Sequence, residues 1–172
     1  MSGAKSKPNE LHRVRRTGRH GCWDQLIIAP LWVAYDANLG TLLRTCDAVG
    51  ACLAVPNTPH YRDCLAIGDT LKRRRPCIHW VSHSKQTWIE SQRDAEKRIV
   101  AVELAEGATP LTRLEPARQP TVLLLGHERN GIPDEVLAIV DECVEIPMVG
   151  YGASLNVAVA GSLVGYRLAG LS

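Results

Sequence analysis

Two polar side chains, Ser154 and Asn156, lie at the start of the apolar segment 155–171, after a loop that contains Gly150 and Gly152. Polar groups among apolar neighbours cost free energy unless they are hydrogen-bonded. A hydroxyl and an amide in this place could orient a reacting group. The alternative is that both belong to a small-residue helix that is packed tightly in the core.

Two earlier segments also carry side chains suited to chemistry. Asn38 stands at the start of a helical pattern, and Arg44 falls outside the apolar stripe of that helix. Glu128 lies in a loop bounded by Gly126 and Gly131, where backbone amides can approach a ligand closely. The simpler readings are a helix cap with a surface arginine, and an ordinary turn with a solvated carboxylate.

The elements that must position these side chains are short apolar strands that alternate with helices. Strands are expected at 25–31, 52–56, 78–81, 98–104, 121–126 and 143–147. Helices are expected at 39–49, 62–75, 88–97, from Pro133 as the first helical residue, and in the terminal segment 155–171. Alternation of this kind predicts an α/β fold, a mostly parallel sheet with helices on both faces. Ligands bind at the carboxyl ends of such strands, and each polar segment above follows a predicted strand.

The length of 172 residues, 45% of them hydrophobic and 22% charged, predicts a single globular domain. We divide the chain into a basic arm, 1–22, and a domain, 23–172. Although the net charge is only +2, the first twenty residues carry six Lys and Arg against Glu10 alone. This arm and the run 72–75 suggest a polyanionic partner such as RNA, but solvated surface charge explains them equally well.

The six cysteines have no CxxC spacing, and the polar N-terminus gives no sign of a signal peptide. We therefore expect reduced thiols in a cytoplasmic protein. A zinc site could be drawn from Cys64, Cys77, His79 and His83, but their spacing does not fit a structural zinc motif. The glycine-rich phosphate-binding signatures and the GxSxG elbow of hydrolases are absent from the sequence.

Taken in order, the three polar segments resemble the motifs of the SpoU/TrmH branch of the SPOUT superfamily, whose members are RNA ribose 2′-O-methyltransferases. The matching residues are Asn38-Leu-Gly40 with Arg44, then Gly126-His-Glu128-Arg-Asn-Gly131, and then Ile146-Pro-Met148 with Ser154-Leu-Asn156-Val157. The resemblance extends over about residues 24–170. Each motif alone is weak, but three in the right order are specific.

The resemblance implies a C-terminal deep trefoil knot, a rare exception to unknotted topology. It also implies that S-adenosylmethionine binds inside the knot through backbone groups, which by position are those of Leu104, Gly126, Ile146 and Leu155. Homodimers that pair through the first and last helices are usual in the family. No metal is required, because the cofactor itself supplies the activated methyl group.

The same resemblance assigns catalytic roles to Arg44, Asn38, Glu128, Ser154 and Asn156. Arg44 would contact RNA phosphate and support the attack of the 2′-hydroxyl. Because a guanidinium keeps its proton at ordinary pH, positioning and charge stabilisation are favoured over action as a base. Asn38 and Glu128 would hold Arg44 and the loop, while Ser154 and Asn156 would order the pocket. RNA would be bound by Arg44 and by four arginines of the arm, Arg13, Arg15, Arg16 and Arg19.

The expected substrate is tRNA, because a domain with few additions suits a structured RNA. Three alternatives remain at this point. The chain could be a catalytically silent, knotted RNA-binding module, it could methylate rRNA at the ribose, or it could methylate a base.

Overall fold

The computed structural model describes residues 25–68 and 76–172. Its centre is a parallel sheet of seven strands in the order β3-β2-β1-β6-β4-β7-β5. The strands are β1 (Leu26–Ala29), β2 (Cys52–Pro56), β3 (Ile78–Val81), β4 (Arg98–Val102), β5 (Thr109–Pro110), β6 (Thr121–Leu125) and β7 (Glu142–Glu145). The predicted α/β class and the parallel sheet are confirmed.

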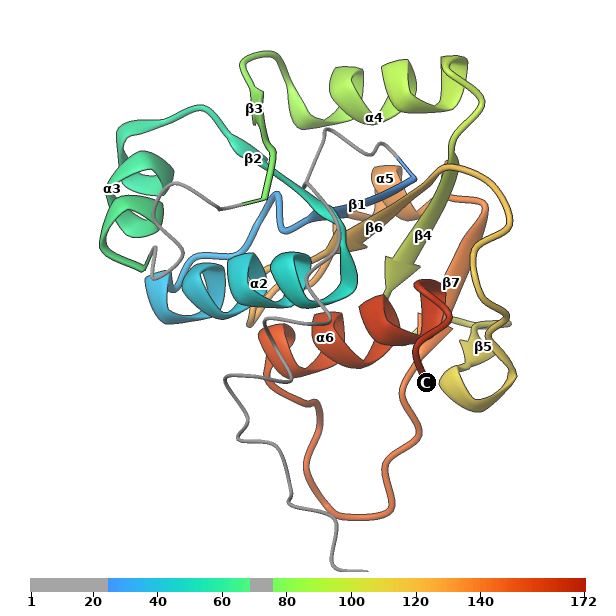
Figure 1. Ribbon diagram of the computed structural model, residues 1–172. Coiled ribbons are helices and arrows are strands. Elements are labelled where there is room, and N and C mark those ends of the chain that lie inside the picture. Colours follow the sequence, from blue (N-terminus) through green and yellow to red (C-terminus); the bar gives the residue numbers. More distant parts are fainter. Residues whose placement is uncertain (1–24, 69–75) are drawn as a thin grey trace, which may run out of the picture.

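Helices cover both faces of the sheet (Figure 1). They are α2 (Asp36–Val49), α3 (Pro59–Gly68), α4 (Lys85–Asp94), α5 (Asp134–Leu137) and α6 (Val157–Leu168), with a short 3₁₀ helix at Leu111–Arg113. The central strands are buried on both sides because alternate residues enter two separate cores. Ile28 joins the core under α2, α3 and α6, whereas Ile27 joins the core under α4 and α5.

Several predicted helix boundaries were wrong. The helix expected at 62–75 begins at Pro59, and its expected end and the basic run 72–75 lie outside the described residues. The helix expected at 88–97 is α4, which begins earlier because the Ser84 hydroxyl accepts a hydrogen bond from the Thr87 amide at 3.0 Å. Pro133 is not the first helical residue, since its ψ of 142° is extended and it stands at the N-cap position, one residue before α5.

A seventh strand, β5, was missed because its two residues lie in a Gly- and Pro-containing stretch that reads as a loop. Thr109 and Pro110 pair with Val144 and Glu145 of β7. The strand is too short to carry a pattern of its own, so only the neighbouring strand reveals it.

The terminal helix also differs from the prediction. It begins at Val157, so Leu155 precedes it, and one side of it is exposed in a stripe formed by Val159, Leu163 and Tyr166. The opposite side packs on α2 and the sheet through Gly161, where an added methyl group would lie within 2.9 Å of a Leu42 side-chain carbon. In the described part of the chain, no helix is long and apolar enough to cross a membrane.

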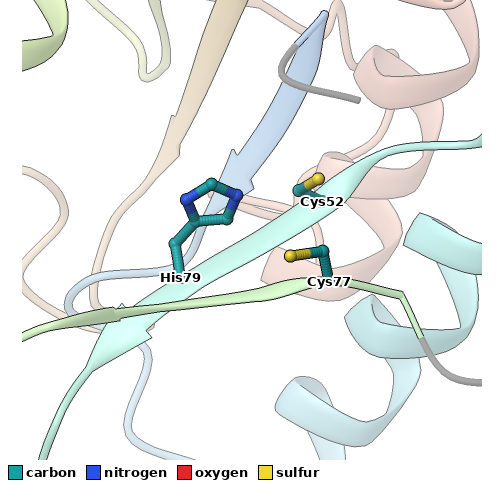
Figure 2. A group of neighbouring side chains, drawn as sticks. All are labelled: Cys52, Cys77 and His79. Carbon is teal, nitrogen blue, oxygen red and sulfur yellow. The ribbon is translucent and has the colours of Figure 1, made fainter. Parts of the chain in front are cut away.

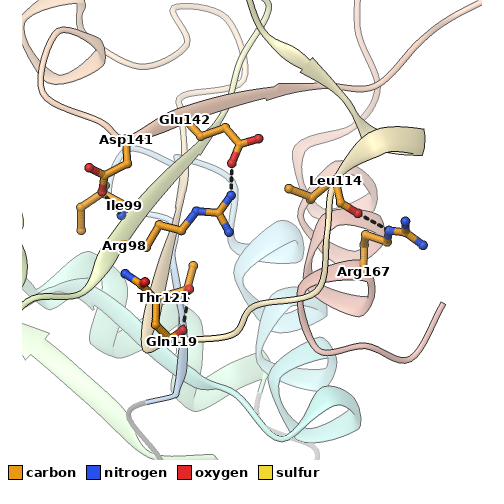
Figure 3. A network of polar contacts seen from close by, with 8 residues as sticks. All are labelled: Arg98, Ile99, Leu114, Gln119, Thr121, Asp141, Glu142 and Arg167. Atoms are coloured by element: carbon orange, nitrogen blue, oxygen red, sulfur yellow. Dashed lines mark hydrogen bonds and ion pairs between the residues drawn. The ribbon is translucent and has the colours of Figure 1, made fainter.

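Polar contacts stabilise the sheet at the amino ends of its strands, opposite to the ends that carry the polar motifs (Figure 3). Arg98, the first residue of β4, forms an ion pair with Glu142, the first residue of β7. The Asp141 carboxylate accepts a hydrogen bond from the Ile99 amide at 2.6 Å. Farther along the molecule, the Arg167 guanidinium donates to the Leu114 carbonyl and so fixes the end of α6. The contacts of Arg98 and Asp141 lie at the amino ends of the strands, whereas the polar motifs follow the carboxyl ends.

Candidate active site

The carboxyl ends of β1 and β6 lie side by side and bring two of the three polar motifs together. The segment 30–35 leaves β1 and enters α2, and the loop 126–132 leaves β6. α6 begins next to them because it packs against α2. The third motif therefore arrives at the same edge.

Glu128 joins the loop after β6 to the start of α2. One carboxylate oxygen accepts a hydrogen bond from the Ala34 amide at 3.0 Å. The other accepts from the Tyr35 amide at 3.1 Å and from the side-chain amide of Asn38 at 2.8 Å. Three donors on one carboxylate fix the segment that enters α2, so Glu128 is a structural clamp at this edge.

A relay of amides extends this clamp to α6. The Asn38 side-chain oxygen accepts a hydrogen bond from Asn156 at 2.9 Å. The Asn156 oxygen in turn accepts from the Ala158 and Val159 amides at 2.9 and 3.2 Å, which makes Asn156 the N-cap of α6. Since Glu128 only accepts and the helix amides only donate, each amide has one orientation that satisfies all its partners. Asn38 is therefore not a helix cap, which was the simpler interpretation of its position. Asn156 caps α6 and also connects this helix to α2 through Asn38.

A double-mutant cycle checks this relay. Asn156→Ser keeps an oxygen for the helix cap but removes the donor to Asn38, and Asn38→Ala removes the acceptor. We expect a coupling energy of about 1 kcal/mol in the free energy of unfolding, as for one internal hydrogen bond. Asn57→Ala, an exposed change elsewhere, should instead add to Asn156→Ser. Additive effects of Asn38→Ala and Asn156→Ser would contradict the relay.

Burial alone would raise the pKa of Glu128, but hydrogen bonds from Ala34, Asn38 and Tyr35 outweigh it, and the pKa lies below its ordinary value. A lowered folded-state pKa adds stability above the unfolded-state pKa of about 4.3, and this stability is lost as the pH falls through the folded pKa. We therefore expect Glu128→Gln to lower the unfolding free energy most at neutral pH.

This prediction is checked by denaturant unfolding of both proteins between neutral and acid pH. The difference between wild type and Glu128→Gln should shrink below about pH 4. Glu106→Gln, at an exposed glutamate, serves as the control. A difference that stays constant over the whole pH range would show that the ionised carboxylate is not the source of the effect.

Two side chains that the sequence analysis did not single out also hold the segment 30–35. The buried Tyr61 hydroxyl of α3 donates to the Val33 carbonyl at 2.8 Å, and a ring nitrogen of His60 lies 3.0 Å from the Ala34 carbonyl. Burial, with the Glu128 charge as a smaller cause, raises the pKa of Tyr61 to about 12, so the hydroxyl remains a donor. The segment is thus held from α3 on one side and from Glu128 on the other.

The glycine loop after β6 is tightly folded. His127 and Gly131 exchange two backbone hydrogen bonds of 3.0 and 2.9 Å. A side chain at Gly126 would collide with this turn, because its first carbon would lie 2.7 Å from the Ile132 nitrogen. Gly131 has a φ of +66°, which favours glycine. Both glycines are therefore required by the backbone.

Glu103, at the end of β4, supports the same loop and was also missed. Its carboxylate accepts hydrogen bonds from the Ile132 amide at 3.1 Å and from the Leu104 amide at 3.2 Å. A carboxylate near the carboxyl end of the predicted strand 98–104, at the end of the sheet that carries the other motifs, is the signal that could have identified it.

A pocket of about 280 Å³ lies where the three motifs meet. Its lining combines amide, carboxylate and hydroxyl groups with two aliphatic side chains, from Tyr35, Asn38, Glu128, Ser154, Leu155, Asn156 and Val157. Four of the five predicted catalytic residues line this pocket. A larger hollow of about 420 Å³, lined by charged residues such as Glu90, Lys97 and Asp141, lies at the opposite edge and holds none of them.

Arg44 is the predicted catalytic residue that does not line the pocket. It is exposed on α2, and no acidic side chain of the described residues forms an ion pair with it. Asn38 and Glu128 hydrogen-bond to each other and to the entering segment, so they fix the helix that carries Arg44 and make no hydrogen bond to its side chain. Among residues 25–68 and 76–172, no hydrogen bond or ion pair occupies its guanidinium.

Of the four residues expected to bind a cofactor, only Leu155 lines the pocket. Leu104, Gly126 and Ile146 follow the neighbouring strands β4, β6 and β7, so they stand along the same edge of the sheet. Leu104 is 77% exposed, Gly126 is buried and Ile146 is half-buried. The arginines predicted to bind RNA from the arm, Arg13, Arg15, Arg16 and Arg19, lie outside the described residues.

Comparison with known proteins identifies the family. Residues 25–166 match the model of the SpoU rRNA methylase family, which is most of the chain. The chain belongs to this family. Its resemblance to the SpoU/TrmH motifs is thereby confirmed.

Individual SpoU relatives agree with this assignment. The chain is 32% identical over 138 residues to the tRNA (guanosine(18)-2′-O)-methyltransferase of Escherichia coli strain K12, and the match covers 76% of this chain and 56% of that protein. The A. aeolicus TrmH/SpoU tRNA modifying enzyme superposes with a TM-score of 0.73 at 26% identity, over 95% of this chain and 82% of that one. The AdoMet-bound rRNA methyltransferase from Sinorhizobium meliloti gives 0.71 at 27% identity, over 84% and 55%. This SpoU domain thus spans about half the length of two of these relatives.

Proposed function

We propose that the protein is an S-adenosylmethionine-dependent RNA methyltransferase that methylates a ribose 2′-hydroxyl, with tRNA as its substrate. The observation that carries the proposal is the convergence of three distant motifs on one hydrogen-bonded pocket, through Glu128, Asn38 and Asn156. The names of the E. coli and A. aeolicus relatives support tRNA as the substrate.

The residues at this edge fit the cofactor. The pocket offers aliphatic contact from Leu155 and Val157 beside amide and hydroxyl groups, as an amphipathic nucleoside requires. Backbone groups of Leu104, Gly126 and Ile146, after three adjacent strands, would complete the binding surface. When bound, S-adenosylmethionine supplies a methyl group that is already activated.

The chain must then supply orientation and charge stabilisation. A ribose hydroxyl is a poor nucleophile and has to be held in line with the methyl group. We assign to Arg44 the contact with the RNA backbone, because a guanidinium binds phosphate in a fixed geometry. Asn38 and Glu128 act through α2, since they fix the start of the helix that carries Arg44, and Ser154 and Asn156 order the pocket wall.

The trefoil knot belongs to this proposal. The segment 146–156 between β7 and α6 extends from the body of the molecule as a long loop (Figure 1). Val149 and Tyr151 in this loop are fully exposed, and Gly150 has open space around it. A glycine-rich loop with a fully exposed middle suits a segment that encloses a cofactor. A cytoplasmic location is supported by the described cysteines, none of which is in a disulfide.

Homodimer formation is proposed from the exposed side of α6. Val159, Leu163 and Tyr166 recur at helical spacing and are 47%, 43% and 38% exposed. We expect Leu163→Asp to convert the protein to monomers in size-exclusion chromatography with light scattering. Leu171→Asp, at an exposed leucine beyond the helix, should leave the dimer unchanged. A wild-type protein that is monomeric at micromolar concentration would contradict the dimer.

The function is tested in two steps. Calorimetry should detect S-adenosylmethionine binding, and its absence at high micromolar cofactor would favour the silent module. Mass spectrometry of nucleosides from tRNA and rRNA of a deletion strain should show the loss of one 2′-O-methyl nucleoside from tRNA. Loss of a 2′-O-methyl nucleoside from rRNA alone would show that the substrate is rRNA and not tRNA. Loss of a base-methylated nucleoside alone would overturn the ribose assignment.

A further inference from the structure

Three side chains at the amino ends of β2 and β3 form a cluster that the proposed methyl transfer does not use. They are Cys52, Cys77 and His79, and their ligand atoms all lie within 4.8 Å of one another (Figure 2). Cys52 is buried, and the other two are half-buried. It is the only cluster of this kind within residues 25–68 and 76–172.

Strand register explains why these residues meet. Leu53 pairs with Ile78, and the Leu53 amide donates to the Cys77 carbonyl at 2.9 Å, so Cys52 and Cys77 are neighbours across the two strands. His79 follows Cys77 by two residues and therefore points to the same face of the sheet. Its partner on β2 is Ala54, whose small side chain leaves room for the imidazole ring.

We propose that Cys52, Cys77 and His79 bind a zinc ion. Two thiolates and one imidazole are ligands that zinc prefers. Around a tetrahedral zinc, ligand atoms stand about 3.8 Å apart, because Zn–S and Zn–N bonds measure about 2.3 and 2.0 Å. The three ligand atoms lie within 4.8 Å of one another, at most about 1 Å beyond that spacing. The described residues supply three of the four ligands that structural zinc sites usually have, and water takes the fourth position. Binding releases the thiol protons to solvent, so affinity falls as the pH falls.

This set differs from the zinc site drawn from the sequence, which combined Cys77 and His79 with Cys64 and His83. Cys64 lies on α3, where its sulfur is 3.7 Å from a ring nitrogen of His60. Neither Cys64 nor His83 belongs to the cluster. Parallel pairing replaces them with Cys52, which lies far from Cys77 in the sequence.

The position of the cluster indicates a structural role. Within the described part of the chain, β3 is the outer strand of the sheet and is paired with β2 alone. Outer strands have an unpaired edge and are weakly held. A zinc ion that joins Cys52 of β2 to Cys77 and His79 would secure the outer strand at its amino end. The polar motifs stand at the carboxyl ends, so this role is independent of the proposed methyl transfer.

The test uses the full chain with Cys22→Ser, so that this cysteine outside the described residues cannot bind metal. Reduced, metal-free protein is titrated with Co²⁺ and then with Zn²⁺. We expect one Co²⁺ per chain with a thiolate-to-cobalt charge-transfer band, and its displacement by Zn²⁺. We also expect Zn²⁺ to raise the melting temperature.

Matched variants separate this site from general thiol binding. Cys77→Ser and His79→Gln should each weaken Co²⁺ binding by more than roughly 100-fold, since even changes beyond the ligands cost about 10–100-fold. Cys143→Ser and His60→Gln, at a half-buried thiol and an exposed imidazole elsewhere, should bind like the parent. Absence of the charge-transfer band, or parental affinity in Cys77→Ser, would overturn the proposal. So would a Cys52–Cys77 disulfide in the isolated protein with no metal uptake after reduction.

Discussion

Arg44→Ala should reduce the rate of RNA methylation by about 100-fold or more, the scale of loss when one charge-stabilising group is removed from an active site. The affinity for S-adenosylmethionine should stay the same. Arg44 is exposed on α2 and does not line the pocket between Asn38, Glu128 and Asn156. Its loss should therefore remove the proposed contact to RNA and leave the proposed cofactor surface intact. Single-turnover methylation and calorimetry measure the two quantities separately.

Two further variants sharpen this test. Arg44→Lys keeps the charge but loses the planar fork, so it should restore only part of the rate. Arg93→Ala removes an exposed arginine from α4, on the other face of the sheet, and should methylate like wild type. If Arg44→Ala loses cofactor affinity in proportion to its rate, Arg44 would belong to the cofactor site and the proposed role would be wrong.

Gly126→Ala is expected to have the second large effect, on stability and cofactor binding together. The added methyl group would lie 2.7 Å from the Ile132 nitrogen and 2.8 Å from the Gly131 oxygen, and backbone atoms cannot rotate away as a side chain does. Overpacking of a close-packed site costs about 1–3 kcal/mol, and a conflict with backbone belongs at the upper end. We expect a loss of about 3 kcal/mol in the free energy of unfolding.

Displacement of the turn 126–131 also moves the backbone proposed to face the cofactor. Calorimetry with S-adenosylmethionine should therefore show binding weakened by at least about tenfold, the equivalent of 1.4 kcal/mol. Gly150→Ala is the matched control for stability, because nothing lies within 4 Å of the added carbon. A Gly126→Ala protein as stable as wild type would show that the turn adapts at little cost.

The sequence predicted the sheet well because two independent signals mark each strand. Runs such as Thr121–Leu125 are apolar on both faces, which is typical of buried parallel strands, and turn or helix signals bound them. The meeting of Asn38, Glu128 and Asn156 could be expected for the same reason, since each follows a strand of one sheet. The spacing could not predict which side chain donates to which in this relay. That depends on which of the two asparagine side chains lies next to the Glu128 carboxylate.

Contacts between distant segments account for most of what was missed. Tyr61 and His60 look like ordinary helix residues until α3 is placed against the segment 30–35. Cys52 has no sequence neighbour that suggests a metal site, and only the register of β2 and β3 brings it beside Cys77. Local patterns determine elements, whereas these roles arise from how the elements are paired.

The strand order also has a consequence for how the chain folds. β1 lies between β2, its near neighbour in sequence, and β6, which is separated from it by most of the domain. The unit formed by β1, β2 and β3 can pair early, yet one side of β1 stays open until Thr121–Leu125 arrives. Pairing between distant strands is slow, since closing a long loop costs entropy before any contact forms. During synthesis, the half-formed sheet therefore exposes an unpaired strand edge that can aggregate. The yield of refolding should accordingly fall as the protein concentration rises.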